Sequence, residues 1–221
     1  MKGQELPPVT IRRHPERGHY DAETIHAIID AAPYCHVAVV RDGMPLVLPT
    51  FHVRIASDIF IHGAVATGFF QELAEGSPVA VAVTLLDGWV LARSWFNHSA
   101  NYRSVVVFGR PREVVDTNEK QRVFEAFAHK VVPGRWQDAR QPSERELRTT
   151  RMFAIPIDHA AAKVRSGPPA DDADDLGRNT WAGVVPTKLV LGEPVPDPGQ
   201  SPSIPFPAYL TEWLKRAQSE S

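Results

Sequence analysis

Residues 84–109, TLLDGWVLARSWFNHSANYRSVVVFG, constrain the fold of this chain more than any other segment. The segment holds two apolar, β-rich runs that are separated by a dense group of polar residues. An Asp-Gly pair at 87–88 precedes the first of these runs, and this pair is among the strongest local signals for a tight β-hairpin. We therefore expect antiparallel strands, with one hairpin turning at Asp87-Gly88.

Residues 35–63 repeat this arrangement of short strands and tight turns. The run 35–40, CHVAVV, is followed by Arg41-Asp42-Gly43, which has the residue types of a hairpin turn. The next run, 44–55, leads into a second turn at 56–58 and then into IFIHG. Three successive strands with such short connections predict an antiparallel meander.

Four short helices are predicted from helical spacing of apolar residues, at 21–32, 64–76, 117–131 and 143–150. Asp21 can cap the first of them, and Thr117 or Asn118 can cap the third. Ser143 and Glu146 have the spacing of a capping box at the start of the fourth.

The order of these elements predicts a mainly β (α+β) fold. Residues 151–167 are expected to supply a last strand, interrupted at 158–162. Six or seven strands joined mainly by hairpins form a closed or half-closed antiparallel β-barrel, with the short helices on its rim.

The chain divides into three parts by composition. Residues 1–20 are polar and contain prolines, so we expect an N-terminal arm before the barrel domain of 21–166. Residues 167–221 are rich in proline and are expected to form a C-terminal arm, whose acidic run at 171–175 is a solvated loop. Trp181 and a short terminal helix can anchor this arm.

The overall composition argues against several classes of function. The chain has 221 residues and a formal net charge of −2, without a basic run, so neither nucleic acid nor an anionic membrane is an expected partner. No window approaches the roughly 18 continuous apolar residues of a membrane-spanning helix, and the first residues lack the apolar centre of a secretory signal. We expect a cytoplasmic protein that binds small molecules or a second copy of itself. The single cysteine, Cys35, excludes an internal disulfide, and its apolar neighbours predict a buried side chain.

The junction from His62 to Gly68 is the first candidate site. A strand that ends in His-Gly runs directly into a predicted helix, whose first N–H groups and small residues could hold an anion such as phosphate. The same glycine and threonine residues serve equally well as an ordinary turn and helix cap, so both interpretations stay open.

The second candidate is the polar group from His98 to Ser104. Six of its seven residues can form hydrogen bonds, and they stand at the entry to the apolar strand VVVFG. A phosphate or a polar heterocycle would satisfy them, with Arg103 as the residue for a phosphate or a dimer contact. The alternative is a solvated hairpin loop.

Several familiar catalytic and metal-binding patterns are missing from the sequence. His36, His52, His62 and His98 lie on or beside predicted strands, but no HxH or HExxH spacing connects them, and no metal site is predicted. The sequence also lacks GxSxG, a P-loop lysine motif and GxGxxG after a strand, so hydrolase, nucleotide triphosphatase and Rossmann dehydrogenase functions lose their usual support.

At these residues the chain resembles the pyridoxamine 5′-phosphate oxidase superfamily, and in particular its FMN-binding branch that contains nitroimidazole-resistance proteins. The resemblance covers about residues 17–190, with the pieces in the family's order. Besides the helix at 124–130, these pieces are CHVAVVRDGMPLVLPTF, IFIHGAVATG, VAVTLLDGWVLARSWFNHSANYRSVVVFGRPREV and KVRSGPP followed by WAGVVP.

The resemblance implies a six- to seven-stranded antiparallel split β-barrel with short flanking helices. It also implies a homodimer with FMN sites at the subunit interface, and it makes His62 a candidate proton donor near pH 7. The cofactor-binding residues that it implies are Leu48, Pro49, Thr50, His62, Gly63, Thr67, Gly68, Asn101, Tyr102, Arg103, Ser104 and Trp181.

Two departures from the family pattern affect the expected function. Many relatives have Arg or Lys shortly after the His-Gly turn, where this chain has Phe69-Phe70-Gln71, so weaker FMN binding is conceivable. The Arg-His pairing of the true oxidases is not recognisable near the C-terminus, and vitamin oxidation is not expected.

The expected function is an FMN-dependent oxidoreductase that reduces a small electron acceptor, such as a nitroaromatic or quinone-like compound. The alternative is a non-catalytic protein that binds or carries flavin, deazaflavin or haem. Haem binding would require His36, His52 or His98 to coordinate the iron.

Overall fold

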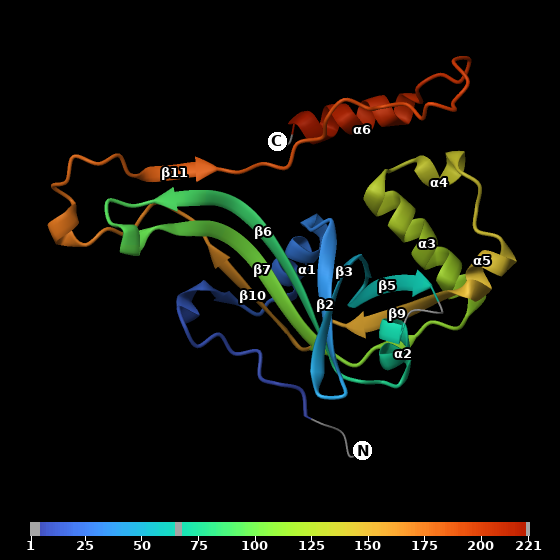
Figure 1. Ribbon diagram of the computed structural model, residues 1–221, viewed down its shortest axis with the longest axis horizontal. Coiled ribbons are helices and arrows are strands. Elements are labelled where there is room, and N and C mark those ends of the chain that lie inside the picture. The colour runs from blue at the N-terminus through green and yellow to red at the C-terminus, as the bar shows by residue number, and fades with distance from the viewer. Residues whose placement is uncertain (1–4, 65–67, 220–221) are drawn as a thin grey trace.

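The computed structural model describes residues 5–64 and 68–219 and consists mainly of two antiparallel sheets with short helices around them (Figure 1). The large sheet has seven strands in the order β1-β10-β7-β6-β2-β3, with β11 added beside β6. The small sheet has the order β4-β5-β9-β8. Neither sheet closes on itself, and together they form the mainly β split barrel that the sequence predicts.

The strands of the large sheet are β1 (Gly18–His19), β2 (Tyr34–Arg41), β3 (Met44–Phe51), β6 (Val79–Leu91), β7 (Ser99–Gly109), β10 (Ala160–Arg165) and β11 (Gly183–Pro186). Those of the small sheet are β4 (Val53–Ile55), β5 (Asp58–Ala64), β8 (Arg112–Glu113) and β9 (Thr150–Pro156). The helices are α1 (Ala22–Ala31), α2 (Gly68–Ala74), α3 (Thr117–Val131), α4 (Arg135–Asp138), α5 (Glu144–Thr149) and α6 (Ala208–Ser219). Within the described ranges, none of these helices is both long and apolar enough to span a membrane.

The first hairpin forms where its turn residues predict it. Asp42 and Gly43 have φ angles of 51° and 77°, and this pair of positive values is typical of the type I′ turn that suits the twist of two paired strands. The turn sets the register in which Val37 pairs with Leu48. A further positive φ, 52° at Ala56, confirms the turn between β4 and β5.

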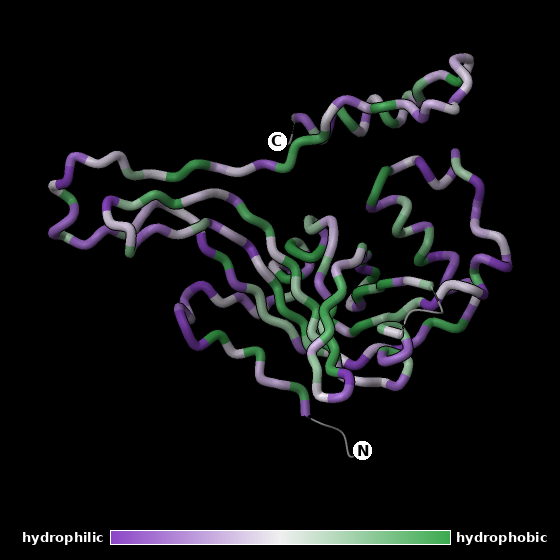
Figure 2. Tube along the Cα trace, in the orientation of Figure 1, coloured by the Kyte–Doolittle hydropathy of each residue, from purple (hydrophilic) through white to green (hydrophobic). Residues whose placement is uncertain are grey.

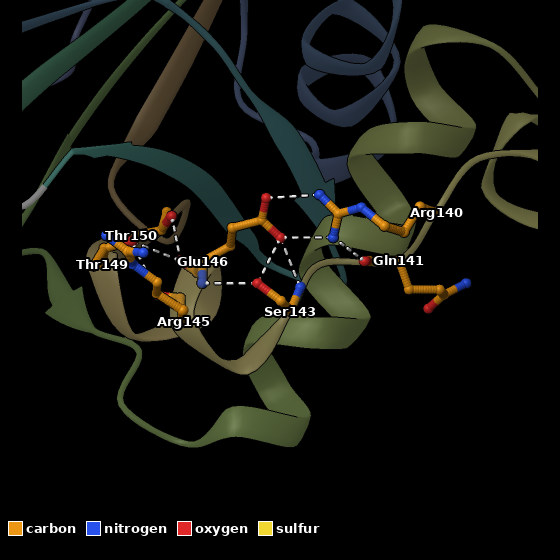
Figure 3. A network of polar contacts seen from close by, with 7 residues as sticks. All are labelled: Arg140, Gln141, Ser143, Arg145, Glu146, Thr149 and Thr150. Carbon is orange, nitrogen blue, oxygen red and sulfur yellow. Dashed lines mark hydrogen bonds and ion pairs between the residues drawn. The ribbon is translucent and has the colours of Figure 1, made fainter.

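The helix starts follow capping chemistry. Asp21 accepts a hydrogen bond from the Thr24 N–H, as predicted, whereas α3 is capped by Asp116, just before the predicted Thr117 or Asn118. The capping box of Ser143 and Glu146 is present. Figure 3 shows both residues of this box, with the Arg140 guanidinium bonded to the Glu146 carboxylate at 2.8 Å. These bonds, from Arg140 first and then from Ser143, lower the pKa of Glu146.

Apolar residues are concentrated where the two sheets converge, as the green segments in Figure 2 show. Val37, Val81 and Val105 face the interior from three adjacent strands, and each is almost completely buried. Cys35 is also fully buried, as predicted, and burial raises the pKa of its thiol to about 12. A smaller apolar cluster fills the space between α3 and the small sheet.

The predicted hairpin at Asp87-Gly88 is wrong. β6 runs without interruption past these residues, and only a register shift between Leu86 and Gly88 marks a bulge in its pairing with β7. Gly88 is instead a point of close approach, because a Cβ there would lie 2.9 Å from the carbonyl oxygen of Val185 in β11. The true turn is at 92–98, so β6 and β7 extend beyond the barrel as a projecting hairpin (Figure 1).

The predicted last strand is in fact two strands. β9 belongs to the small sheet, where Phe153 pairs with Ile61, and β10 belongs to the large sheet, where Ala162 pairs with Val105. The crossing from one sheet to the other takes only residues 157–159, because β10 begins at Ala160, so the predicted interruption at 158–162 is too long.

The C-terminal region follows the projecting hairpin and then returns toward α4 (Figure 1). β11 pairs with the far end of β6, and the Tyr209 hydroxyl in α6 donates to the carboxylate of Asp138 at 2.7 Å. The division into an arm at 1–20, a domain at 21–166 and an arm at 167–221 stays a prediction.

A Gly88→Ala variant tests the close contact between β6 and β11. We expect β11 to detach, because the new methyl group would overlap the Val185 carbonyl. Limited digestion with trypsin at Arg178 and Lys188 should become faster than in the wild type. The matched control is Gly192→Ala, where an added Cβ meets nothing within 4 Å. Equal digestion of Gly88→Ala and wild-type protein would contradict this account.

Candidate functional site

The residues Leu48, Pro49 and Thr50 lie on β3, which is the last strand of the large sheet. Leu48 packs against the barrel core, and Pro49 is opposite His36 in the register with β2. Within the described chain, β3 pairs in the large sheet only with β2, so its other edge can offer backbone N–H and C=O groups to a ligand.

His62 and Gly63 lie near the end of β5, but their roles in the structure differ. The His62 ring packs against Phe124 and Phe127 of α3, at centroid distances of 5.4 Å and 4.6 Å. Burial lowers the pKa of His62, which keeps its ring neutral near pH 7. Gly63 is required for packing, because a Cβ there would lie 2.1 Å from the Phe70 ring. A catalytic role of His62 therefore stays a prediction.

Arg41 is a candidate binding residue that the sequence did not indicate. Its Nη1 lies 3.0 Å from the position that a Cβ on Gly68 would occupy, and its Nε lies 3.9 Å from a Glu72 carboxylate oxygen. Gly68 is the first residue of α2, and the predicted Thr67 just before it lies outside the described residues. Arg41 thus supplies a cation near the turn where Phe69-Phe70-Gln71 provides none.

Asn101 has a structural task at the base of the C-terminal arm. Its side-chain oxygen accepts a hydrogen bond from Arg165, and its amide nitrogen donates to the Gly167 carbonyl at 3.1 Å. Arg165 also donates to the Pro168 carbonyl at 3.3 Å. Both Asn101 and Arg165 are buried, so these contacts join β7 to the segment that follows β10.

The other residues of this group also have protein partners. The Arg103 guanidinium bonds to both carboxylate oxygens of Asp87, at 2.7 Å and 3.0 Å, and this pairing raises the pKa of Arg103. Ser104 donates to the Lys163 carbonyl at 3.2 Å, and Tyr102 is opposite Leu86 in the sheet. Trp181 is two-thirds exposed in the segment before β11.

The predicted site residues form two separate groups within one chain. Leu48–Thr50 are on β3 and Asn101–Ser104 are on β7, and the strands β2 and β6 lie between these two strands in the large sheet. Three strand spacings correspond to about 14 Å across the sheet. A single chain therefore does not bring Leu48–Thr50 together with Asn101–Ser104.

One face of the large sheet is exposed and apolar. We call this surface the outer face; its most exposed members, between 53% and 60% accessible, are Tyr34, Val40, Val47 and Phe51. Tyr34 is opposite Phe51, and along β2 the exposed positions alternate with buried ones. A contiguous apolar surface of this kind is typical of a protein interface.

The structure separates the three histidines that haem binding could use. His52 is completely buried, with its Nε2 2.8 Å from the Ile29 carbonyl oxygen and 3.0 Å from Lys130 Nζ. It cannot reach a ligand without unfolding. His36 is exposed on the outer face, and His98 lies at the end of the projecting hairpin. Within 5–64 and 68–219, no three His, Cys, Asp or Glu residues form a metal-binding group.

The turn of the projecting hairpin is held by the acidic run of the C-terminal arm. Asp171 accepts from the backbone N–H and the guanidinium of Arg93, both at 2.7 Å, and its side chain is only 2% exposed. Asn97 donates to Asp172 at 3.3 Å. The predicted solvated loop is therefore wrong for Asp171, because Arg93 in the turn of the projecting hairpin supplies its partners.

A His52→Gln variant tests the buried histidine through its effect on stability against pH. Burial, and then the nearby charge of Lys130, lower the pKa of His52 to about 4. The unfolded chain takes up this proton near pH 6.5, so folding stability falls as the pH drops from about 6.5 to about 4. Wild-type protein should lose about 3 kcal/mol more than the variant over this range.

The measurement is urea unfolding of both proteins at several pH values, with the difference between the two curves as the readout. Parallel curves between pH 7 and pH 4 would contradict the assignment of a neutral, buried His52.

Comparison with known proteins agrees with the split barrel and its predicted family. The family model for pyridoxamine 5′-phosphate oxidase matches residues 21–164. The chain belongs to the pyridoxamine 5′-phosphate oxidase family. No curated protein matches the sequence significantly.

Two solved structures are similar over nearly the whole chain. The flavocytochrome Anf3 from Azotobacter vinelandii is 36% identical, with a TM-score of 0.87 over 92% of this chain and 95% of that one. The FAD and haem binding protein from Mycobacterium smegmatis is 33% identical, with a TM-score of 0.85 over 89% and 96%. A candidate 5-nitroimidazole antibiotic resistance protein from Bacteroides thetaiotaomicron shares the fold, with 21% identity and a TM-score of 0.57 over 66% and 86%.

Proposed function

We propose that this chain is a flavin-binding redox protein that acts as a homodimer, with each flavin site built from both subunits. The observation that carries this proposal is that two strands, β2 and β6, separate the two groups of site residues in the large sheet. A second copy packed on the outer face would bring Leu48–Thr50 of one chain near Asn101–Ser104 of the other. The names of the two most similar structures described above support a flavin as the ligand.

The residues of the first group fit the parts of a flavin nucleotide. The free edge of β3 offers backbone groups to the polar rim of a flat ring, and Leu48 offers apolar contact. Arg41 lies beside Gly68, where it can pair with a phosphate group. Arg103 is a weaker candidate for that task, because Asp87 already neutralises its charge. The flavin would supply the electron transfer, and the protein would hold the ring and exclude water.

We also propose which flavin is bound and which reaction it supports. FMN is the flavin that the sequence pattern favours, and FAD is the one named for the M. smegmatis relative. We propose reduction of a small electron acceptor, such as a nitroaromatic or quinone-like compound. Among the described residues, no cluster of side chains suggests a different reaction. The alternative is flavin carriage without turnover. Rapid reduction of the bound flavin by NADH or NADPH, followed by reoxidation by a nitro compound, would decide against that alternative.

Haem is a second candidate ligand, supported by a specific observation. Both similar structures, at 36% and 33% identity, are described as a flavocytochrome or as a haem-binding protein. His36 is exposed and His98 is half-buried, so both can serve as ligands, whereas the fully buried His52 cannot. We therefore propose haem binding in addition to flavin binding.

The visible spectrum of the purified protein, with mass identification of the molecules released on denaturation, tests the ligands directly. We expect a flavin. A colourless protein that shows no thermal stabilisation by FMN or FAD would contradict the proposed function.

An Arg41→Ala variant tests the phosphate contact. Loss of a charge-assisted pair of about 1.5–3 kcal/mol should weaken FMN or FAD binding by about 10- to 100-fold. Riboflavin has no phosphate, so its affinity should stay the same. The matched control is Arg148→Ala, whose side chain is 70% exposed and pairs only at the surface with Glu144. Equal affinity of wild-type and Arg41→Ala protein for FMN and FAD would exclude Arg41 from the site.

A further inference from the structure

The projecting hairpin carries an unusual amount of exposed aromatic surface. We call the end of β6 and β7, the turn at 92–98 and the neighbouring segment 181–186 the aromatic lobe. Trp95 and Phe96 in its turn are 88% and 92% exposed, and Trp89 and Trp181 are more than half exposed. Large aromatic side chains that gather on a surface usually contact a ligand or a partner.

His98 lies in this lobe with one ring nitrogen already engaged. Its Nδ1 is 2.8 Å from the Ser94 carbonyl oxygen. A carbonyl oxygen can only accept a hydrogen bond, so Nδ1 carries the proton and Nε2 keeps its lone pair. A hydrogen bond from the second ring nitrogen to a carbonyl is the usual support of a metal-binding histidine, because it fixes the tautomer and the ring orientation.

The surroundings of His98 hold the ring in place. Trp95 stacks on it, with a centroid distance of 4.6 Å and an interplanar angle of 20°. Ser94 caps the short helical turn by accepting from the Phe96 N–H at 3.2 Å. The pairing of Arg93 with Asp171 fixes the start of the turn to the C-terminal arm. The turn is therefore preorganised by contacts on both sides of His98.

The other candidate histidines lack this arrangement. His52 is closed off in the core, and the His62 ring is packed under α3. His36 is accessible, but its ring contact is the edge of Tyr34 at 5.7 Å, which does not select a tautomer. Among these four histidines, His98 combines a half-buried position with a carbonyl partner on Nδ1.

We propose that Nε2 of His98 is an axial ligand of a haem iron, and that the aromatic side chains of the lobe cover the porphyrin. This inference rests on the haem binding proposed above and assigns the iron ligand within it. An apolar, flat macrocycle matches exposed tryptophan and phenylalanine rings, and a neutral imidazole is a common ligand of haem iron. The lobe thus has a ligand-binding role distinct from that of β3 and Arg41.

The test is titration of the haem-free, full-length protein with hemin, followed by absorption and magnetic circular dichroism. Wild-type protein should give a Soret band that differs from free hemin and a spectrum of histidine-ligated iron. His98→Ala should lose this spectrum and bind hemin at least about 10-fold more weakly. Added imidazole should restore the ligated spectrum, because it can occupy the space left by the missing ring.

Two further variants separate ligation from folding. His98→Met should give a different, thioether-type spectrum, and His36→Ala should keep the wild-type spectrum. Asp171→Ala should weaken hemin binding but keep the histidine-ligated spectrum, because it loosens the turn without removing the ligand. Unchanged FMN or FAD affinity in His98→Ala would show that the barrel is intact.

The results distinguish this inference from the function on which it rests. If wild-type protein gives no Soret shift, haem binding itself fails, and the assignment of His98 fails with it. If the wild type binds hemin but His98→Ala keeps its spectrum, the assignment is overturned while haem binding stands. Loss of the ligated spectrum in His36→Ala, with an unchanged spectrum in His98→Ala, would show that His36 on the outer face is the iron ligand.

Discussion

The continuous antiparallel pairing of β6 with β7 is the interaction on which the rest of the molecule depends. At one end of this ladder, Val81 and Val105 face the barrel core, and at the other end the strands form the aromatic lobe. The ladder passes through Gly88, where the absence of a side chain lets β11 pair with β6. A true hairpin at Asp87-Gly88 would have ended the sheet at the barrel and left no lobe.

The strand order explains why the candidate site is divided. β2 and β6 lie between β3, which carries Leu48–Thr50, and β7, which carries Asn101–Ser104, so the two groups are about 14 Å apart across the sheet. Several members of the second group already have protein partners, as in the pair of Arg103 with Asp87. Their contribution to a ligand would be a shaped, preorganised surface beside a neighbouring subunit. Arg41 would be the cation of the first group, and its contact with Glu72, at 3.9 Å, is longer than the pairing of Arg103 with Asp87 at 2.7 Å.

Local chemistry made much of the fold predictable. Turn residues such as Asp42-Gly43 and the capping box of Ser143 and Glu146 act over three or four residues, and the structure confirms them. The family, and with it the split barrel, followed from longer motifs. The errors concern contacts between distant segments. Gly88 lacks a side chain because β11 packs against it, and Asp171 is buried because it pairs with Arg93. No local pattern contains that information.

The candidate site was predictable only in part for the same reason. Motif resemblance named residues that the structure places mainly on β3, β5 and β7, and their role in a site stays a prediction. Strand alternation and packing decide where each side chain points. His62 faces the rings of α3, and Arg41, which had the features of a turn residue, reaches Gly68. The histidines illustrate the limit most clearly. His36, His52 and His98 all lie on or beside predicted strands, and the sequence does not distinguish them as ligands, but the structure gives them different burial and different partners.

The central claim is that two chains complete each flavin site, and a charge on the outer face tests it most directly. Val47 is 59% exposed in the single chain, so Val47→Glu should leave the barrel folded while it prevents close packing of two outer faces. Light scattering after size exclusion, combined with flavin titration, should show a wild-type dimer with bound flavin and a folded Val47→Glu monomer without it. A Val47→Glu monomer that binds flavin with wild-type affinity would contradict the account.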